Sequence, residues 1–172
     1  MKHLIVGSGK MSRHFAFYLN SLFNEDIESS GQPGHQHSFD LSIKPTITTW
    51  NRSQPTEFLY DLANNADRIW LLISDNALES FYQEHLQKFN KMVIHFSGAL
   101  EINGMIAAHP LMTFSTQLYG KEFYPRIPFI IDRPDLNMQD LAAEIKNPTY
   151  YLSAEHKPYY HALCVLGGNL PH

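Results

Sequence analysis

The first dozen residues of the chain combine residue types at a spacing that suits anion binding. Residues 4–6 form a short aliphatic run, and a helical pattern opens directly after Gly7-Ser8-Gly9. Glycine lets the backbone turn tightly and approach a pyrophosphate, and the first turn of a helix offers it free N–H groups. The pattern predicts a dinucleotide site, although an ordinary Gly-rich turn has the same signature. The residues of this predicted site are Gly7, Ser8, Gly9, Lys10, Met11 and Ser12.

The residues after the second predicted strand, over 46–50, indicate which dinucleotide this site would take. An NAD site places an acid there to accept from the ribose 2′-hydroxyl, whereas an NADP site needs a cation for the 2′-phosphate. Here the strand is followed by Asn51, Arg52 and Ser53, with no acid. The guanidinium of Arg52 suits phosphate, so the sequence favours NADP over NAD, with an ordinary surface arginine as the alternative. The missing acid also disfavours S-adenosylmethionine.

Three further predicted strands end in small or polar residues. These strands are expected over 68–73, 92–96 and 105–108. Ser74 and Asp75 follow the first of them and are predicted to line the cofactor, with capping of the next helix as the alternative. Ser97 follows the second strand and His109 the third. Because ligands of doubly wound sheets collect at the carboxyl ends of the strands, we expect all these segments to meet there.

His109 is the predicted general acid or base, because an imidazole titrates near neutral pH and Pro110 restricts the backbone beside it. The alternative is that it only bonds the backbone at a strand end. Ser97 is predicted to hydrogen-bond substrate or nicotinamide, with a tight turn as the alternative. His95 and Cys164 are expected to be core residues. No Ser-His-Asp arrangement, Cys-x-x-Cys motif or zinc-ligand spacing occurs, so we predict no metal site.

Alternating strands and helices must position these residues. The apolar periodicity predicts helices over 10–23, 55–64, 76–89, 136–146 and 155–167, with further strands over 129–131 and 150–152. The polar segment 24–45 is predicted to be an inserted loop with a short strand near 39–43. The alternation indicates an α/β fold with a doubly wound, mainly parallel sheet, the Rossmann-like NAD(P)-binding fold.

Composition restricts the function further. The chain has 172 residues, 44% hydrophobic and 17% charged, with a formal net charge of −4. The negative charge disfavours nucleic-acid binding through phosphate neutralisation, and no apolar run approaches the roughly 18 residues of a membrane span. A lone cysteine excludes an internal disulfide framework and favours a reducing compartment, hence the cytoplasm. We therefore expect a small-molecule partner and neither nucleic acid nor membrane.

Five motifs occur in a characteristic order along the chain. They are Gly7-Ser8-Gly9-Lys10-Met11-Ser12, Trp50-Asn51-Arg52-Ser53, Ile73-Ser74-Asp75, His95-Phe96-Ser97-Gly98-Ala99-Leu100 and His109-Pro110-Leu111-Met112-Thr113-Phe114. Together they resemble a branch of Rossmann-like oxidoreductases in the 6-phosphogluconate dehydrogenase-like superfamily, related to pyrroline-5-carboxylate reductase and prephenate dehydrogenase. The resemblance implies an NADP-binding domain over 1–152 and, over 153–172, the start of a helical domain that forms a homodimer and closes the active site.

Relative to the domain that the resemblance implies, we expect this sequence to cover only the first part. The resemblance also implies substrate-facing roles for His161 and Asn169, which lie about two helical turns apart on one face, with fraying as the alternative. The resulting prediction is an NADP-binding domain of an oxidoreductase that exchanges hydride between NADP(H) and a small carbonyl, imine or alcohol. The alternatives are a nucleotide-binding module without turnover and a remnant that binds no nucleotide.

Overall fold

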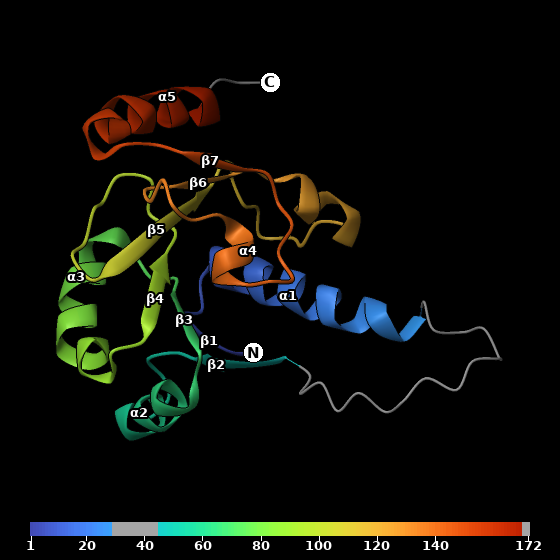
Figure 1. Ribbon diagram of the computed structural model, residues 1–172, viewed down its shortest axis with the longest axis vertical. Coiled ribbons are helices and arrows are strands. Elements are labelled where there is room, and N and C mark those ends of the chain that lie inside the picture. The colour runs from blue at the N-terminus through green and yellow to red at the C-terminus, as the bar shows by residue number, and fades with distance from the viewer. Residues whose placement is uncertain (29–44, 170–172) are drawn as a thin grey trace.

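The computed structural model describes residues 1–28 and 45–169, without the side chains of 24–28, 154, 165 and 167–169. Strands and helices alternate along it (Figure 1). The strands are β1 (Lys2–Val6), β2 (Thr46–Trp50), β3 (Arg68–Leu71), β4 (Met92–His95), β5 (Met105–Pro110), β6 (Phe129–Ile131) and β7 (Thr149–Tyr151). The α-helices are α1 (Lys10–Glu28), α2 (Thr56–Asn65), α3 (Asp75–Phe81), α4 (Met138–Leu141) and α5 (Lys157–Asn169).

The seven strands form one sheet in the order β2-β1-β3-β4-β5-β6-β7. All neighbouring strands are parallel except β5 and β6, which are antiparallel. The chain leaves β1 toward β2 on one side and returns to β3 on the other, so the strand order reverses between β1 and β3. The predicted doubly wound, mainly parallel α/β fold is confirmed, and its switch point lies beside the Gly-rich turn.

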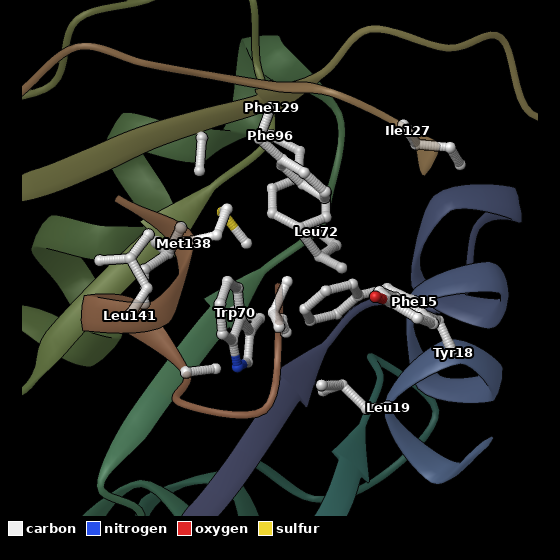
Figure 2. Close-up of a cluster of buried hydrophobic side chains, with 14 of the residues drawn as sticks. Phe15, Tyr18, Leu19, Trp70, Leu72, Phe96, Ile127, Phe129, Met138 and Leu141 are labelled. Atoms are coloured by element: carbon white, nitrogen blue, oxygen red, sulfur yellow. The ribbon is translucent and has the colours of Figure 1, made fainter. Parts of the chain in front are cut away.

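Each face of the sheet carries its own apolar core, because successive side chains of a strand point to opposite faces. Ile5 of β1 and Trp70 of β3 pack in one core with residues of α1 and α4. Their neighbours Leu4 and Leu71 belong to the other core, with residues of α2 and α3. Figure 1 shows α1 and α4 on one side of the sheet and α2 and α3 on the other. Figure 2 shows the first core, in which Trp70 lies between α1 and α4.

A buried polar network fixes the segment between β5 and β6 to α1. His14 donates from Nε2 to the carbonyl oxygen of Ser115, 3.1 Å away, so its Nδ1 accepts from the Tyr124 hydroxyl at 2.8 Å. Asn147 accepts from the Tyr18 hydroxyl at 2.6 Å. Its amide nitrogen donates to the carbonyl oxygens of Tyr124 and Ile127. These bonds satisfy polar groups that would be costly to bury unpaired.

Three predicted boundaries were wrong. Helix α1 continues to Glu28, so part of the predicted 24–45 loop is helical, and the predicted strand near 39–43 lies outside the described residues. The predicted helix 76–89 is α3 followed by a π-helix, Tyr82–Leu86, and a 3₁₀ turn, Gln87–Phe89. The predicted helix 136–146 is helical only over Met138–Leu141. Beyond it the chain turns extended at Ala142, since tertiary bonds of Asn147 outweigh the helical propensity.

The remaining short elements are the 3₁₀ helices Lys121–Arg126 and Ala154–His156. The second of these leads directly into α5, which Figure 1 shows beyond β7. Pro158 lies in the first turn of α5, as expected. In the described part of the chain, no helix has the length and apolar character needed to cross a membrane.

Candidate functional site

The turn between β1 and α1 depends on a glycine at its first position. Gly7 has a φ of +136°, and a Cβ atom added to it would collide with the carbonyl oxygen of Leu72. Its N–H donates to the carbonyl oxygen of Trp50, 2.8 Å away, which ties the turn to the end of β2. The turn therefore brings the ends of β1, β2 and β3 together, and only glycine adopts this conformation without strain.

The N-terminus of α1 presents free backbone donors beyond this turn. The first intrahelical bond that follows the turn runs from the N–H of Arg13 to the carbonyl oxygen of Gly9, at 3.1 Å. The N–H groups of residues 10–12 therefore precede the helical ladder. A Cβ atom on Gly9 would meet no other atom within 4 Å, so the space in front of this turn is open. Ser12 is buried instead, and its hydroxyl donates to the carbonyl oxygen of Gly9 at 2.9 Å.

The loop after β2 is a compact turn that leaves Arg52 exposed. The side-chain oxygen of Asn51 accepts from the N–H of Ser53 at 3.0 Å and from its hydroxyl at 2.6 Å. The N–H of Asn51 donates to the side chain of Gln54 at 3.0 Å. An asparagine that bonds the backbone two residues ahead in this way sets the turn itself. Arg52 carries none of these bonds, and its exposed side chain lines the cleft described next.

These three strand ends surround one cleft of about 480 Å³. Of the predicted cofactor residues, eight line it: Gly7, Ser8, Gly9, Lys10, Met11, Asn51, Arg52 and Ser74. Three do not, namely Ser12, Ser53 and Asp75. The described lining contains two cations, Lys10 and Arg52, and no carboxylate. The volume is that of a ligand site, and its charge suits a ligand that carries phosphate.

The sequence analysis missed the apolar walls of this cleft. The walls are Trp50, Leu72, Ile73, Ala77 and Phe81. Trp50 and Phe81 contact each other with ring centroids 5.9 Å apart, although they belong to different elements. Trp50 and Leu72 lie at the predicted strand ends, so their positions in the sequence could have indicated that they line the cleft. Phe81 follows the helical period of α3 and gives no local signal of its position.

Asp75 and Ser97 connect this cleft to the next strand end. Ser74 takes the N-cap position of α3, but its side chain makes no capping bond, so the predicted cap is wrong in that respect. The Asp75 carboxylate accepts from the Ser97 hydroxyl at 2.7 Å. The Ser97 oxygen also accepts from the N–H groups of Ala99 and Leu100, at 3.3 and 3.2 Å. Ser97 is thus buried in a turn that Asp75 holds to α3.

His95 lies behind this turn in the core, as expected from its apolar strand. It is fully buried, and its Nδ1 accepts from the N–H of Ser97 at 3.2 Å. Its Nε2 is buried without a partner among the described residues. Burial lowers the pKa of His95 to about 4, because desolvation penalises the charged ring. The ring is therefore neutral near pH 7.

His109 lies against the backbone of the same turn. A Cβ atom on Gly98 would come within 3.1 Å of the His109 ring, so a bare glycine allows this close packing. The Nδ1 of His109 is 2.7 Å from the hydroxyl of Tyr160 on α5. Burial lowers the pKa of His109 to about 4, and the neighbouring His161 adds to this effect. His109 is thus a neutral imidazole at the end of β5, one nitrogen of which bonds α5.

A buried ion pair attaches α5 to the sheet close to His109. The Nζ of Lys157 is 3.0 Å from the Asp132 carboxylate and donates to the carbonyl oxygen of Leu100 at 2.8 Å. The two side chains are only 6% and 12% exposed. Asp132 also accepts from the N–H of Ala107 at 3.1 Å. Sequence reasoning missed this pair, because its members are 25 residues apart and follow no motif.

Beside His109 lies a small cavity of about 10 Å³, the room of about one water molecule, which we call the His109 cavity. The residues that line it include Ser97, Gly98, His109, Asp132, Lys157 and Tyr160. The structure thus brings predicted Ser97 and His109 together. His161 is exposed on α5 and does not line this cavity, and the side chain of Asn169 lies outside the described residues. Within the described residues, no group of three or more His, Cys, Asp or Glu side chains is placed to hold a metal ion.

Comparison with known proteins supports the fold through structure alone. Neither a protein-family model nor a curated relative matches the sequence. A Bacteroides fragilis protein assigned as an NADP oxidoreductase superposes with a TM-score of 0.62 at 16% identity, over 98% of this chain and 66% of its own. An NADH-preferring ketol-acid reductoisomerase from an uncultured archaeon superposes with a TM-score of 0.55 at 11% identity, over 97% of this chain and 57% of its own.

The fold is therefore the Rossmann-like fold that nicotinamide-dependent reductases also have. This chain spans less than two thirds of the length of either solved structure. At these identities the likeness concerns the arrangement of the sheet and its helices.

Proposed function

We propose that the chain binds NADP(H) in the cleft at the ends of β1, β2 and β3. The observation that carries this proposal is the composition of the cleft, which joins two cations and free helix N–H groups at the switch point without any carboxylate among the described lining. The residues present fit a dinucleotide. The turn 7–9 and the first N–H groups of α1 would hold the pyrophosphate, with Lys10 beside them.

The 2′-phosphate would bind at the turn after β2. Arg52 is exposed there, and Asn51 and Ser53 already satisfy each other in the turn. An acid that would repel the phosphate is missing from the described lining of the cleft. NADP is therefore favoured over NAD, and the protein of similar fold from Bacteroides fragilis is assigned as an NADP oxidoreductase.

The bound nicotinamide would supply hydride chemistry, for a small carbonyl, imine or alcohol substrate. The chain would supply the proton-transfer group, and His109 is the residue for this role. The cleft and the His109 cavity are linked through α3, since Ser74 lines the cleft and the adjacent Asp75 holds the turn of Ser97 that contacts His109. His109 is neutral near pH 7, so a ring nitrogen is available to accept a proton from a substrate during the reaction.

A second candidate function is a nucleotide-binding module without turnover. The observation that favours it is the pairing around His109, where Ser97 and Lys157 are each engaged within the chain. In this case the chain binds NADP(H) but transfers no hydride. His109→Ala would then leave the NADPH affinity unchanged, and neither the native chain nor the variant would transfer hydride.

Calorimetric titration with NADPH and NADH tests the cofactor proposal on the native chain and on Arg52→Ala. Loss of a charged hydrogen bond costs about 1.5–3 kcal/mol, so NADPH affinity should fall roughly tenfold to a hundredfold, while NADH affinity changes little. The matched control is Arg126→Ala, an exposed arginine outside the cleft. Equal losses for both nucleotides would refute the role of Arg52, and no binding of either would refute the cofactor proposal.

A further inference from the structure

We propose that His85 is a positioning residue of the cleft. Held by Tyr60 of α2, it keeps the ring of Phe81 against Trp50, where the purine of bound NADP(H) would pack. We call these four side chains, Trp50, Phe81, His85 and Tyr60, the ring row. The ring row is a feature of this chain alone, whereas the purine contact rests on the proposed function.

The ring row begins in the wall of the cleft and continues behind it. The Phe81 ring contacts Trp50, with centroids 5.9 Å apart, and meets His85 edge-on, with centroids 4.7 Å apart and planes at 60°. The Nδ1 of His85 is 3.1 Å from the Tyr60 hydroxyl, and this bond holds both rings whichever of the two atoms donates. Trp50 and Phe81 line the cleft, but His85 and Tyr60 do not. His85 can therefore act on a ligand only through Phe81.

Both ends of the ring row are attached to α2, which lies on the same face of the sheet as α3 (Figure 1). Trp50 donates from Nε1 to the carbonyl oxygen of Pro55, the N-cap residue of α2, at 3.1 Å. Tyr60 belongs to α2 itself, and the Nζ of Lys88 lies 3.4 Å from the centre of its ring. This cation–π contact favours one position of the phenol. Helix α2 thus fixes the distance between the two ends of the ring row.

The helix that carries Phe81 changes its winding at this residue. Phe81 is the last residue of α3, and the π-helix Tyr82–Leu86 follows it directly. The N–H of Gln87 donates to the carbonyl oxygen of Tyr82, five residues back, instead of four residues back as in an α-helix. The wider turn includes His85. Because π-helical turns are rare and occur frequently at functional sites, this one supports a functional reason for the contact between His85 and Phe81.

The part of the ligand that would meet this wall follows from the position of Arg52. Arg52 lies two residues after Trp50, and both line the cleft. The 2′-phosphate proposed for Arg52 belongs to the ribose that carries the purine, so the purine would lie within one sugar ring of it. Bases pack favourably on aromatic side chains. A Phe81 ring that His85 already holds loses less freedom when the purine packs on it, so the nucleotide binds more tightly.

Calorimetric titration with adenosine 2′,5′-bisphosphate, which carries the purine and the 2′-phosphate without the nicotinamide, tests the proposal. His85→Leu removes both the edge-on contact with Phe81 and the bond to Tyr60. The affinity should fall about threefold to tenfold, the effect of one lost aromatic contact. The matched control is His156→Leu, an exposed histidine outside the cleft, which should bind like the native chain.

Double variants show whether His85 acts through its neighbours. Phe81→Leu removes the ring on which the purine would pack, so adding His85→Leu to it should cause no further loss of affinity. General damage to the fold by His85→Leu would persist in that background. Tyr60→Phe removes only the hydroxyl and should weaken binding about twofold to fivefold, within the effect of one hydrogen bond. It should add nothing to the loss in His85→Leu.

The outcomes separate this inference from the proposed function. Equal affinity of the native chain and His85→Leu, or equal losses with and without the Phe81 ring, would overturn the role of His85 and leave the NADP(H) proposal intact. A chain that binds adenosine 2′,5′-bisphosphate through the ring row, but not NADPH, would establish the purine site and refute the NADP(H) proposal. A native chain that binds neither molecule would refute both.

Discussion

In the cleft at the ends of β1, β2 and β3, Lys10 and Arg52 are exposed, and the first N–H groups of α1 precede any helical bond. Around His109 the polar groups are already engaged. Lys157 bonds Asp132, and Ser97 bonds Asp75. Both regions lie at the carboxyl ends of strands of one sheet, and β4 separates β3 of the cleft from β5, which carries His109. The cleft presents unpaired donors to solvent, whereas most donors around His109 are hydrogen-bonded within the chain.

The difference indicates how the two regions meet a ligand. An open cleft with unused donors can bind a large charged molecule from solvent without first breaking internal bonds. A closed region binds little by itself, but it holds a few atoms in fixed positions, which is what a proton-transfer group needs. In the proposed function, the binding energy would come from the cleft and the orientation from the residues around His109. Each of the following experiments changes one of the two regions.

The largest effect is expected from Lys157→Met in the closed region. This change leaves the buried Asp132 carboxylate without its cation, and breaking a buried ion pair in this way costs about 3–5 kcal/mol. Urea unfolding should show that loss. NADPH affinity of the folded fraction should stay within about twofold, because Lys157 does not line the cleft. A loss under about 1 kcal/mol would contradict the view that this region is closed.

The features that the sequence predicted share a local cause. The Gly7 turn, the alternation of strands and helices and the polar residues at strand ends each follow from neighbouring residues, so periodicity and turn chemistry suffice. Eight of the eleven predicted cofactor residues line one cleft for that reason. Ser12 and Ser53 each follow a residue that lines the cleft, but they do not line it themselves. The Ser12 hydroxyl donates to the carbonyl oxygen of Gly9, and the Ser53 hydroxyl donates to the side chain of Asn51.

The features that the sequence did not predict are pairings across long separations. Tyr160 meets His109 across 51 residues, and Lys157 meets Asp132 across 25. No period or motif encodes which helix returns to which strand end. The shortened α4 has the same origin, because bonds of Asn147 to Tyr124 and Ile127 decide where that helix stops. The sequence therefore predicts which residues lie at the sheet edge, and not which of them become partners.

A matched pair of glycine substitutions sharpens the comparison within the cleft. Gly7→Ala forces a side chain into a left-handed conformation and against the Leu72 carbonyl, which should cost at least about 2 kcal/mol of unfolding free energy. Gly9→Ala meets no atom within 4 Å and should cost less than about 1 kcal/mol. Its methyl group projects into the space proposed for pyrophosphate, so NADPH affinity should still fall about tenfold. Equal stability losses for both variants would contradict the structure of the turn.

The smallest effect is a pH dependence that should come from the closed region. Burial lowers the pKa of His95 to about 4, below its ordinary value of 6.5, so the unfolded chain binds this proton more readily. Its contribution to stability is complete above pH 6.5 and decreases as pH falls toward 4. Linkage gives about 2 kcal/mol lost by pH 5. His95 bonds the backbone of Ser97, so this part of the loss belongs to the region around His109. Burial also lowers the pKa of His3 to about 4, which adds a loss outside both regions.

His95→Asn tests this assignment, because the side-chain oxygen of asparagine can still accept from the N–H of Ser97. Urea unfolding of the native chain and the variant should be compared at pH 7.5 and pH 5. The native chain should lose about 2 kcal/mol more than the variant between the two pH values. An identical loss in both chains would show that His95 is not buried as a neutral ring. The region around His109 would then be more open than its hydrogen bonds indicate, and the contrast with the cleft would weaken.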